Sequence, residues 1–224
     1  MKKLRIPGII ALFLALFLLT TSAIQEGRET EKLHDAANVL KEFGKMKESI
    51  PHELISEYEG VVIIPNMINA GLGIGGKRGK GVAIVKLDSN KWSDPVFVTL
   101  TGGSVGPQIG VQSVDLVMVF RHKGVLAKVK DGDFTIGGDI SAAAGPVGRT
   151  TSANTDYKLE AEVYSYSRSR GLFAGISING SSLSIDKKAN HDYYGDSMTA
   201  QDIFADAKSD TKAVKLLKAT LASL

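Results

Sequence analysis

The sequence predicts an α+β fold: an antiparallel, β-rich core of the barrel or sandwich type, with amphipathic helices at its N-terminal and C-terminal ends. Between residues 61 and 178, short β-like runs follow one another closely, separated by turn residues rather than by helices of about 10–15 residues. Residues 31–46 and 200–221 instead show the apolar spacing of amphipathic helices. A chain of this length suits one compact domain with a substantial core.

The first 23 residues have the pattern of a secretory signal peptide. Basic residues come first, an unbroken apolar run fills residues 9–19, and small residues occupy 21–23. The apolar run is shorter than the ~20 residues that a membrane-spanning helix needs. We therefore predict a signal peptide at residues 1–23, and an uncleaved membrane anchor is the alternative.

The remaining chain, residues 24–224, is predicted to be a single domain, with its core at about 35–195 and C-terminal helices at 198–223. It contains no cysteine, which excludes disulfides, thiolate metal sites, cysteine nucleophiles and a lipidated signal segment. We expect an exported, unlipidated protein that is periplasmic or secreted and that can associate peripherally with the membrane.

The charge balance argues against nucleic acid as a partner. Three of the 27 basic side chains lie in residues 1–23, which contain no acid, so the rest of the chain carries 24 basic and 24 acidic side chains. Charge is nevertheless unevenly distributed, because residues 24–59 hold nine acids against five Lys or Arg. A basic cluster interrupted only by Asp88 follows: Lys77, Arg78, Lys80, Lys86 and Lys91.

Helices are predicted at both ends of the domain. Residues 24–31 are polar and are expected to form a flexible N-terminus, and a helix over 31–46 follows. Its apolar face consists of Leu33, Ala36, Ala37, Leu40, Phe43 and Met46. This face is expected to pack on the sheet, and the alternative is that it lies on a membrane surface. Further helices are predicted at residues 51–58, 200–207 and 211–221.

The β-like runs are interrupted by turn residues such as Pro65-Asn66 and Gly102-Gly103. Strands are predicted at residues 61–64, 82–87, 96–100, 105–112, 114–120, 136–144, 159–166 and 172–178. For residues 123–130 a short helix is favoured over a strand.

Residues 71–81 combine six glycines with three cations, a density that indicates positive φ angles or close backbone approach. Two nucleotide-binding patterns match this segment in part. The dinucleotide fingerprint requires a following helix, whereas residues 82–87 favour a strand. The phosphate-loop pattern requires Ser or Thr where this chain has Arg78. We interpret the segment as a glycine-enabled turn in a β-rich region.

No catalytic constellation is found, and we predict a protein that is not an enzyme and has no cofactor and no metal site. The four histidines lack the spacing of metal ligands, and no serine lies in a nucleophile elbow. Asp115 and Asp139 are acids in otherwise apolar strands. They are expected to accept hydrogen bonds from backbone or hydroxyl donors, and acid–base chemistry is the alternative.

Residues 164–173 form a second cluster in which aromatic and basic side chains alternate with serine. Alternation in a strand puts Tyr164, Tyr166 and Arg168 on one face. This face could bind an anionic ligand or a partner, or it could be a row of tyrosines that packs against a barrel wall. The pattern leaves both readings open.

Several segments resemble the SYLF domain family, in the same order and over about residues 35–195. The matching segments are Gly60-Val61-Val62-Ile63-Ile64-Pro65, the glycines at 71, 73, 75, 76, 79 and 81, Lys91-Trp92-Ser93 with Pro95, Gly106, Gln108, Gly110, Gln112 and Asp115, then Gly137-Gly138-Asp139, residues 144–149, residues 166–175 and residues 190–195.

The resemblance implies a lipid-binding module and not an enzyme. Eukaryotic members of the family bind phosphoinositides, fungal actin-patch members also bind and bundle actin, and exported bacterial members resemble periplasmic or surface lipid-binding proteins. Two departures are evident in these 224 residues: no SH3 domain accompanies the SYLF pattern, and no lipobox cysteine is present. Because the chain is expected to be exported, actin is not an expected natural partner.

The basic residues and the resemblance together predict binding to anionic phospholipid at the cell envelope. Lys77, Arg78 and Lys80 are the first candidates for lipid binding, and Arg168 and Arg170 are the second. Three cations near an anionic surface would contribute roughly 3 kcal/mol, on the order of a hundredfold in partitioning. The alternative function is a structural or protein-interaction domain, with an envelope protein as partner and no lipid specificity.

Overall fold

The computed structural model describes residues 27–46, 50–89, 91–127, 134–145, 161–173, 176–205 and 208–224. The predicted signal peptide at residues 1–23 lies outside these ranges. Among the described helices, none is both long enough and apolar enough to cross a membrane.

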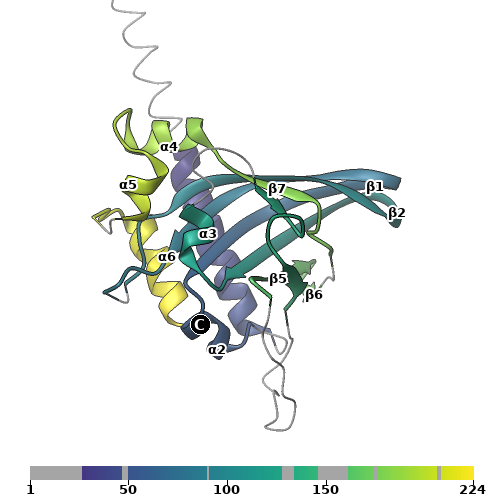
Figure 1. Cartoon of the computed structure of the whole chain (residues 1–224), viewed down its shortest axis with the longest axis horizontal. Coiled ribbons are helices and arrows are strands. Elements are labelled where there is room, and N and C mark those ends of the chain that lie inside the picture. Colours follow the sequence, from purple (N-terminus) through teal and green to yellow (C-terminus); the bar gives the residue numbers. More distant parts are fainter. Residues whose placement is uncertain are drawn as a thin grey trace, which may run out of the picture.

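Two long antiparallel strands, β1 (Gly60–Val85) and β2 (Val96–Phe120), organise the sheet. They pair in two stretches, residues 60–72 with 109–120 and residues 74–83 with 96–105, and the register shifts between Leu72 and Ile74. Figure 1 shows the helices gathered towards one side of the molecule and both strands extending beyond them on the other.

Strand β1 doubles back on itself near Leu72 and Ile74, so that its second half lies against its first. A Cβ atom built on Gly81 would overlap the carbonyl oxygen of Ile63, and one built on Gly75 would overlap the carbonyl oxygen of Ala70. Only glycine allows backbone to approach backbone this closely. The predicted glycine-enabled turn is therefore confined to the end of a hairpin, and the glycines from Gly75 to Gly81 lie within strand.

The remaining strands extend the sheet from both halves of β2. Strand β5 (Val163–Ser169) pairs with residues 115–120, and strand β7 (Ser181–Ile185) pairs with residues 98–102. Strand β3 (Phe134–Ile136) pairs with β7. Strands β4 (Ala142–Ala144) and β6 (Leu172–Phe173) both pair with β5, and the β4–β5 pair is parallel. The seven named strands belong to one sheet, which is nearly closed and barrel-like. The predicted α+β fold with a β-rich barrel core is confirmed.

Alternating residues of the sheet contribute to two hydrophobic cores. On the outer face, Ile63, Val82 and Val117 pack with the N-terminal helix, residues 27–45, and with the C-terminal helix. The helices on this face include α2 (His52–Glu57) and α6 (Lys212–Ala222). On the inner face, side chains such as Ile64 and Met118 fill the barrel together with apolar residues of α3 (Lys123–Ala127) and α5 (Ala200–Phe204).

The N-terminal helix is part of the protein core. Leu33, Leu40 and Phe43 are fully buried in the outer core. The alternative in which this apolar face lies on a membrane surface is therefore wrong. The helix also includes residues 27–31, which were expected to be a flexible N-terminus; that expectation is wrong for these residues.

Several strand and helix boundaries differ from the sequence prediction. The strand predicted at residues 136–144 is interrupted by Gly137, whose φ of 84° produces a turn, so β3 and β4 are separate. Strand β7 and helix α4 (Lys187–Tyr194) were not predicted, because β7 is rich in serine and α4 carries little apolar surface. Of residues 172–178, only Leu172–Phe173 is a described strand.

The tyrosine row predicted on β5 belongs to the outer core. Tyr164 and Tyr166 are buried there, and the rings of Tyr58 and Tyr164 lie 6.0 Å apart. Burial, together with the neighbouring Tyr164, raises the pKa of Tyr58 to about 12. For the tyrosines, the interpretation as a row that packs against the barrel wall is confirmed.

We predict that Gly81→Ala destabilises the fold by about 3 kcal/mol, since the new methyl group must displace backbone rather than a flexible side chain. The measurement is the free energy of unfolding from urea titration. Gly103→Ala is the matched control in β2, because a Cβ there meets nothing within 4 Å, and it should change stability by less than about 0.5 kcal/mol. Equal effects of the two substitutions would contradict the doubled-back strand.

Candidate functional site

The three cations of residues 77–80 divide between the two faces of β1. Lys77 points into the barrel, where only 6% of the residue is exposed and its amine donates a hydrogen bond to the carbonyl oxygen of Ser177. Burial lowers the pKa of the Lys77 amine. Arg78 and Lys80 point to the outer face, because successive strand residues alternate. Lys77 is therefore inaccessible to a flat ligand surface.

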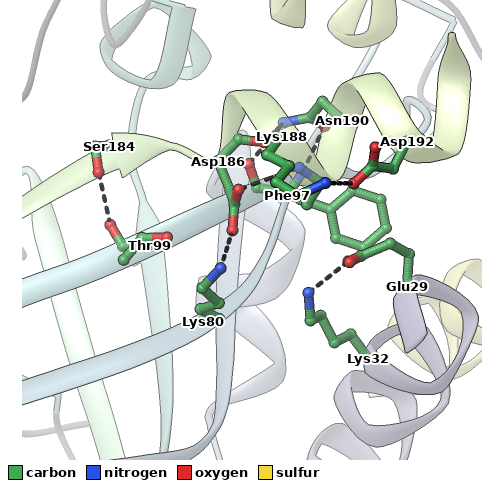
Figure 2. Close-up of polar contacts among 11 residues, drawn as sticks. Glu29, Lys32, Lys80, Phe97, Thr99, Ser184, Asp186, Lys188, Asn190 and Asp192 are labelled. Carbon is green, nitrogen blue, oxygen red and sulfur yellow. Dashed lines mark hydrogen bonds and ion pairs between the residues drawn. The ribbon is translucent and has the colours of Figure 1, made fainter. Parts of the chain in front are cut away.

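Lys80 is held by the first turn of α4. Its Nζ lies 2.7 Å from Oδ2 of Asp186, and the other carboxylate oxygen of Asp186 accepts a hydrogen bond from the backbone N–H of Ala189 (Figure 2). Burial would raise the pKa of Asp186, but the hydrogen bonds from Lys80 and Ala189 outweigh it and lower the pKa. Lys80 therefore serves mainly to fasten α4 to β1.

Helix α4 is fixed to the sheet by a buried amide as well. The side chain of Asn190 accepts a hydrogen bond from the N–H of Phe97 at 2.9 Å and donates one to the carbonyl oxygen of the same residue at 2.8 Å (Figure 2). The amide thus pairs with the backbone of β2 as a neighbouring strand would. Asp186 and Asn190 were not identified from sequence, although Asp186 precedes the helix at the position where a carboxylate caps the first turn.

Arg168 is also paired. Its Nη2 lies 2.7 Å from Oδ2 of Asp115, a second nitrogen lies 3.5 Å from Glu42, and the guanidinium is 6.0 Å from the ring of Phe43. The other oxygen of Asp115 accepts the N–H of Asn66, which lies at the register shift between Ile64 and Met67. Arg168 thereby connects β5, β2 and the N-terminal helix.

The predicted structural role of Asp115 and Asp139 is confirmed, although Asp139 lies in the turn after β3 and not in a strand. Asp115 accepts a backbone hydrogen bond at a bulge, and Asp139 accepts the backbone N–H of Thr135 at 2.7 Å. In the described parts of the chain, no group of three or more His, Asp or Glu side chains is placed to hold a metal ion.

Two of the five candidate cations are both exposed and unpaired in the described parts of the chain. Arg78 lies on the outer face of β1, and Arg170 lies in the turn between β5 and β6 with a φ of 50°. Within the described ranges, neither guanidinium has an ion pair or a hydrogen bond to another residue. These two side chains are therefore available to an external anion.

Exposed apolar side chains lie between Arg78 and the free end of β1 and β2, and on the neighbouring strands. Leu72 and Ile74, on either side of the β1 turn, are 77% and 79% exposed, and Val111 and Ile68 are 75% and 46% exposed. Leu172, which begins β6 directly after the turn that holds Arg170, is 72% exposed. We call Ile68, Leu72, Ile74, Val111 and Arg78 the hairpin end.

Members of the hairpin end share the outer face of the sheet. Val111 and Val117 lie an even number of residues apart in β2, so they share one face of the strand, and the same is true of Arg78 and Val82 in β1. Both valines belong to the core beneath the helices. Val111 pairs with Ala70 of β1, and Ala70 lies on the same strand face as Ile68 and Leu72. The outer face of the sheet is therefore covered by helices near Val82 and Val117 and is uncovered at the hairpin end. Sequence reasoning missed its apolar members, although large apolar residues between glycines in a turn were a visible signal.

No acid accompanies these cations in the strands. Residues 60–87 contain no Asp or Glu, and residues 96–114 contain none either. The nearest acid along β2, Asp115, is paired with Arg168. The exposed charge of the hairpin end is consequently positive.

Comparison with known proteins identifies the family. The family model described as Ysc84, Las17-binding protein actin regulator, matches residues 101–224. The chain is 35% identical over 190 residues to SH3 domain-containing YSC84-like protein 1 of Xenopus laevis, covering 81% of this chain and 56% of that protein. The chain belongs to the Ysc84 (SYLF) family.

Other SYLF relatives show the same partial overlap. The human YSC84-like protein 1 is 34% identical over 189 residues, covering 81% of this chain and 55% of that protein. LAS seventeen-binding protein 3 of Saccharomyces cerevisiae is 32% identical over 186 residues, covering 79% of this chain and 40% of that protein. The chain thus spans about half the length, or less, of these relatives. The predicted SYLF resemblance is confirmed, and the family consists of non-enzymatic binding or adaptor domains.

We predict that the tie between Lys80 and Asp186 makes stability depend on pH. Because the folded-state pKa of Asp186 is below its ordinary value of 3.8, its contribution is present above pH 3.8 and is lost as pH falls through the lower folded value. The stability difference between wild type and Asp186→Asn, measured by urea unfolding, should be constant from pH 7 to about pH 5 and shrink below pH 3.8.

Asp210→Asn is the matched control, because Asp210 pairs with Lys215 at 3.1 Å but is 88% exposed. Exposed ion pairs contribute little, so this substitution should have a small effect. A difference for Asp186→Asn that persists unchanged to pH 2 would contradict the assigned role of its carboxylate.

Proposed function

We propose that this SYLF domain is an exported, non-enzymatic lipid-binding module that associates with anionic phospholipid at the cell envelope. The observation that carries the proposal is the pair of exposed arginines, Arg78 and Arg170, which lack a described partner and lie beside exposed apolar side chains. Export rests on the sequence pattern of residues 1–23.

The energetics favour weak and reversible association. A basic residue near an anionic membrane contributes about 1 kcal/mol, so Arg78 and Arg170 together supply about 2 kcal/mol, roughly thirtyfold in partitioning. Lys80 adds less because Asp186 neutralises it, Arg168 is paired with Asp115, and Lys77 is buried. The hairpin end and the β5–β6 turn are therefore the parts of the proposed lipid surface that carry available charge.

The alternative function is a structural or protein-interaction domain of the envelope. Exposed Leu72, Ile74 and Val111 are the observation that favours it, because a protein partner would also remove these side chains from water. The description of the family as Las17-binding actin regulators is consistent with protein interaction by relatives. This alternative predicts a complex that is insensitive to lipid charge.

We predict that Arg78→Gln/Arg170→Gln lowers partitioning onto vesicles of phosphatidylglycerol and phosphatidylcholine about thirtyfold, since each arginine contributes about 1 kcal/mol. The measurement is co-sedimentation over a range of lipid concentrations. Wild-type binding should weaken as salt increases and should be lost on pure phosphatidylcholine.

Lys187→Gln/Lys212→Gln is the matched control. Both lysines are exposed and lie on α4 and α6, away from the hairpin end (Figure 1), and their replacement changes net charge equally. It should leave partitioning within about twofold of wild type, because screening confines electrostatic attraction to roughly 10 Å. If both double variants lost binding equally, only total charge would matter and the assignment of the arginines would fail.

A further inference from the structure

We propose that the hairpin end inserts into the acyl-chain region of an anionic membrane, with Leu72 and Ile74 leading. This inference rests on the proposed lipid-binding function and adds which part of the molecule enters the bilayer. The occupant of the exposed apolar surface is thus a membrane and not a second protein chain.

Contiguity distinguishes this surface from the scattered apolar residues that any protein exposes. Leu72 and Ile74 flank one turn, and Ile68 lies on the same face of β1 as Leu72. Val111 pairs with Ala70 from the neighbouring strand. Three of the four apolar side chains are at least 75% exposed. A cluster of this kind on a soluble surface marks a binding site for an apolar partner.

Backbone hydrogen bonding permits the hairpin end to leave water. Unpaired N–H and C=O groups exclude irregular backbone from the hydrocarbon region of a bilayer. Here the ladder of β1 with β2 continues to the pairs Leu72↔Ile109 and Ile74↔Val105. Most polar backbone groups behind the turn are therefore satisfied within the protein.

The positions of the arginines fit this orientation. Arg78 lies four residues behind Ile74 on the same face, about 13 Å along an extended strand. Amphipathic elements bury their apolar faces about 5–10 Å into the boundary between headgroups and acyl chains. When Leu72 and Ile74 reach that depth, Arg78 remains at the level of the lipid phosphates.

The β5–β6 turn provides a second contact beside the hairpin end. The hydroxyl of Ser169 donates a hydrogen bond to the carbonyl oxygen of Ser113 at 3.1 Å, which holds the turn next to β2. Arg170 in this turn and the exposed Leu172 at the start of β6 repeat the combination of a cation and an apolar side chain.

Shape and charge favour a membrane over a protein partner. Specific protein interfaces bury about 800 Å² on each partner, whereas the hairpin end is a narrow projection (Figure 1). Its strands contain no acid in residues 60–87, so the charge that these strands carry, including the exposed Arg78, attracts an anionic surface.

The test uses the absence of cysteine from the chain. Leu72→Cys introduces a single thiol, which is labelled with an environment-sensitive fluorophore; Leu216→Cys on the exposed face of α6 is the matched control. With phosphatidylglycerol vesicles, the label at position 72 should shift to shorter wavelength and brighten severalfold. Lipids that carry a spin label on the acyl chain should quench it, and the label at position 216 should remain in water.

A second pair of variants avoids the label. Leu72→Ser/Ile74→Ser should lower vesicle partitioning by at least about tenfold, because both side chains enter the apolar boundary. Met198→Ser/Leu216→Ser should leave it unchanged. All four positions are exposed, so every variant should keep the wild-type melting temperature.

The outcomes separate the two proposals. If wild type sediments with anionic vesicles while the label at position 72 stays aqueous, the insertion is refuted and the lipid-binding function stands. If wild type does not sediment with any vesicle, both are refuted. A shift of the position-72 label that depends on protein concentration, without lipid, would show that a second copy is the occupant and would overturn the insertion.

Discussion

The close contact between the two halves of β1 is the constraint on which the rest of the structure depends. Gly75 and Gly81 allow backbone to lie against backbone, so a 26-residue strand doubles back and becomes two adjacent strands of a barrel. Strand β2 follows the same path because its register is set by β1. The remaining strands attach to the two halves of β2, and the helices cover the outer face, so each later element takes its position from this fold-back.

The same constraint separates structural cations from exposed ones. Alternation along the second half of β1 sends Lys77 into the barrel, while Arg78 and Lys80 face outwards. Lys80 pairs with Asp186 at the start of α4, whereas Arg78 is exposed and has no ion pair among the described residues. A basic cluster that is continuous in sequence thus becomes one buried amine, one ion pair and one available guanidinium.

The sequence predicted the fold class, the apolar face of the N-terminal helix and the structural roles of Asp115 and Asp139, because these follow from periodicity and from hydrogen-bonding needs. It did not predict β7 and α4, whose positions depend on tertiary pairing through Asn190 and Asp186. Among the candidate cations, sequence could not tell Arg78 from Lys77 or Lys80, since burial and pairing are set by the fold-back. Exposed Leu72 and Ile74 were read as part of a glycine-rich turn, and only the fold shows that helices leave them uncovered.

Hydrogen–deuterium exchange with and without phosphatidylglycerol vesicles tests the central claim, that the hairpin end is the part of the molecule that faces a membrane. The account predicts slower exchange in residues 68–78 and 109–113 when vesicles are present, with unchanged exchange in α4 and α6. Protection of α6 or of the N-terminal helix in place of the hairpin end, on vesicles that the protein binds, would contradict it.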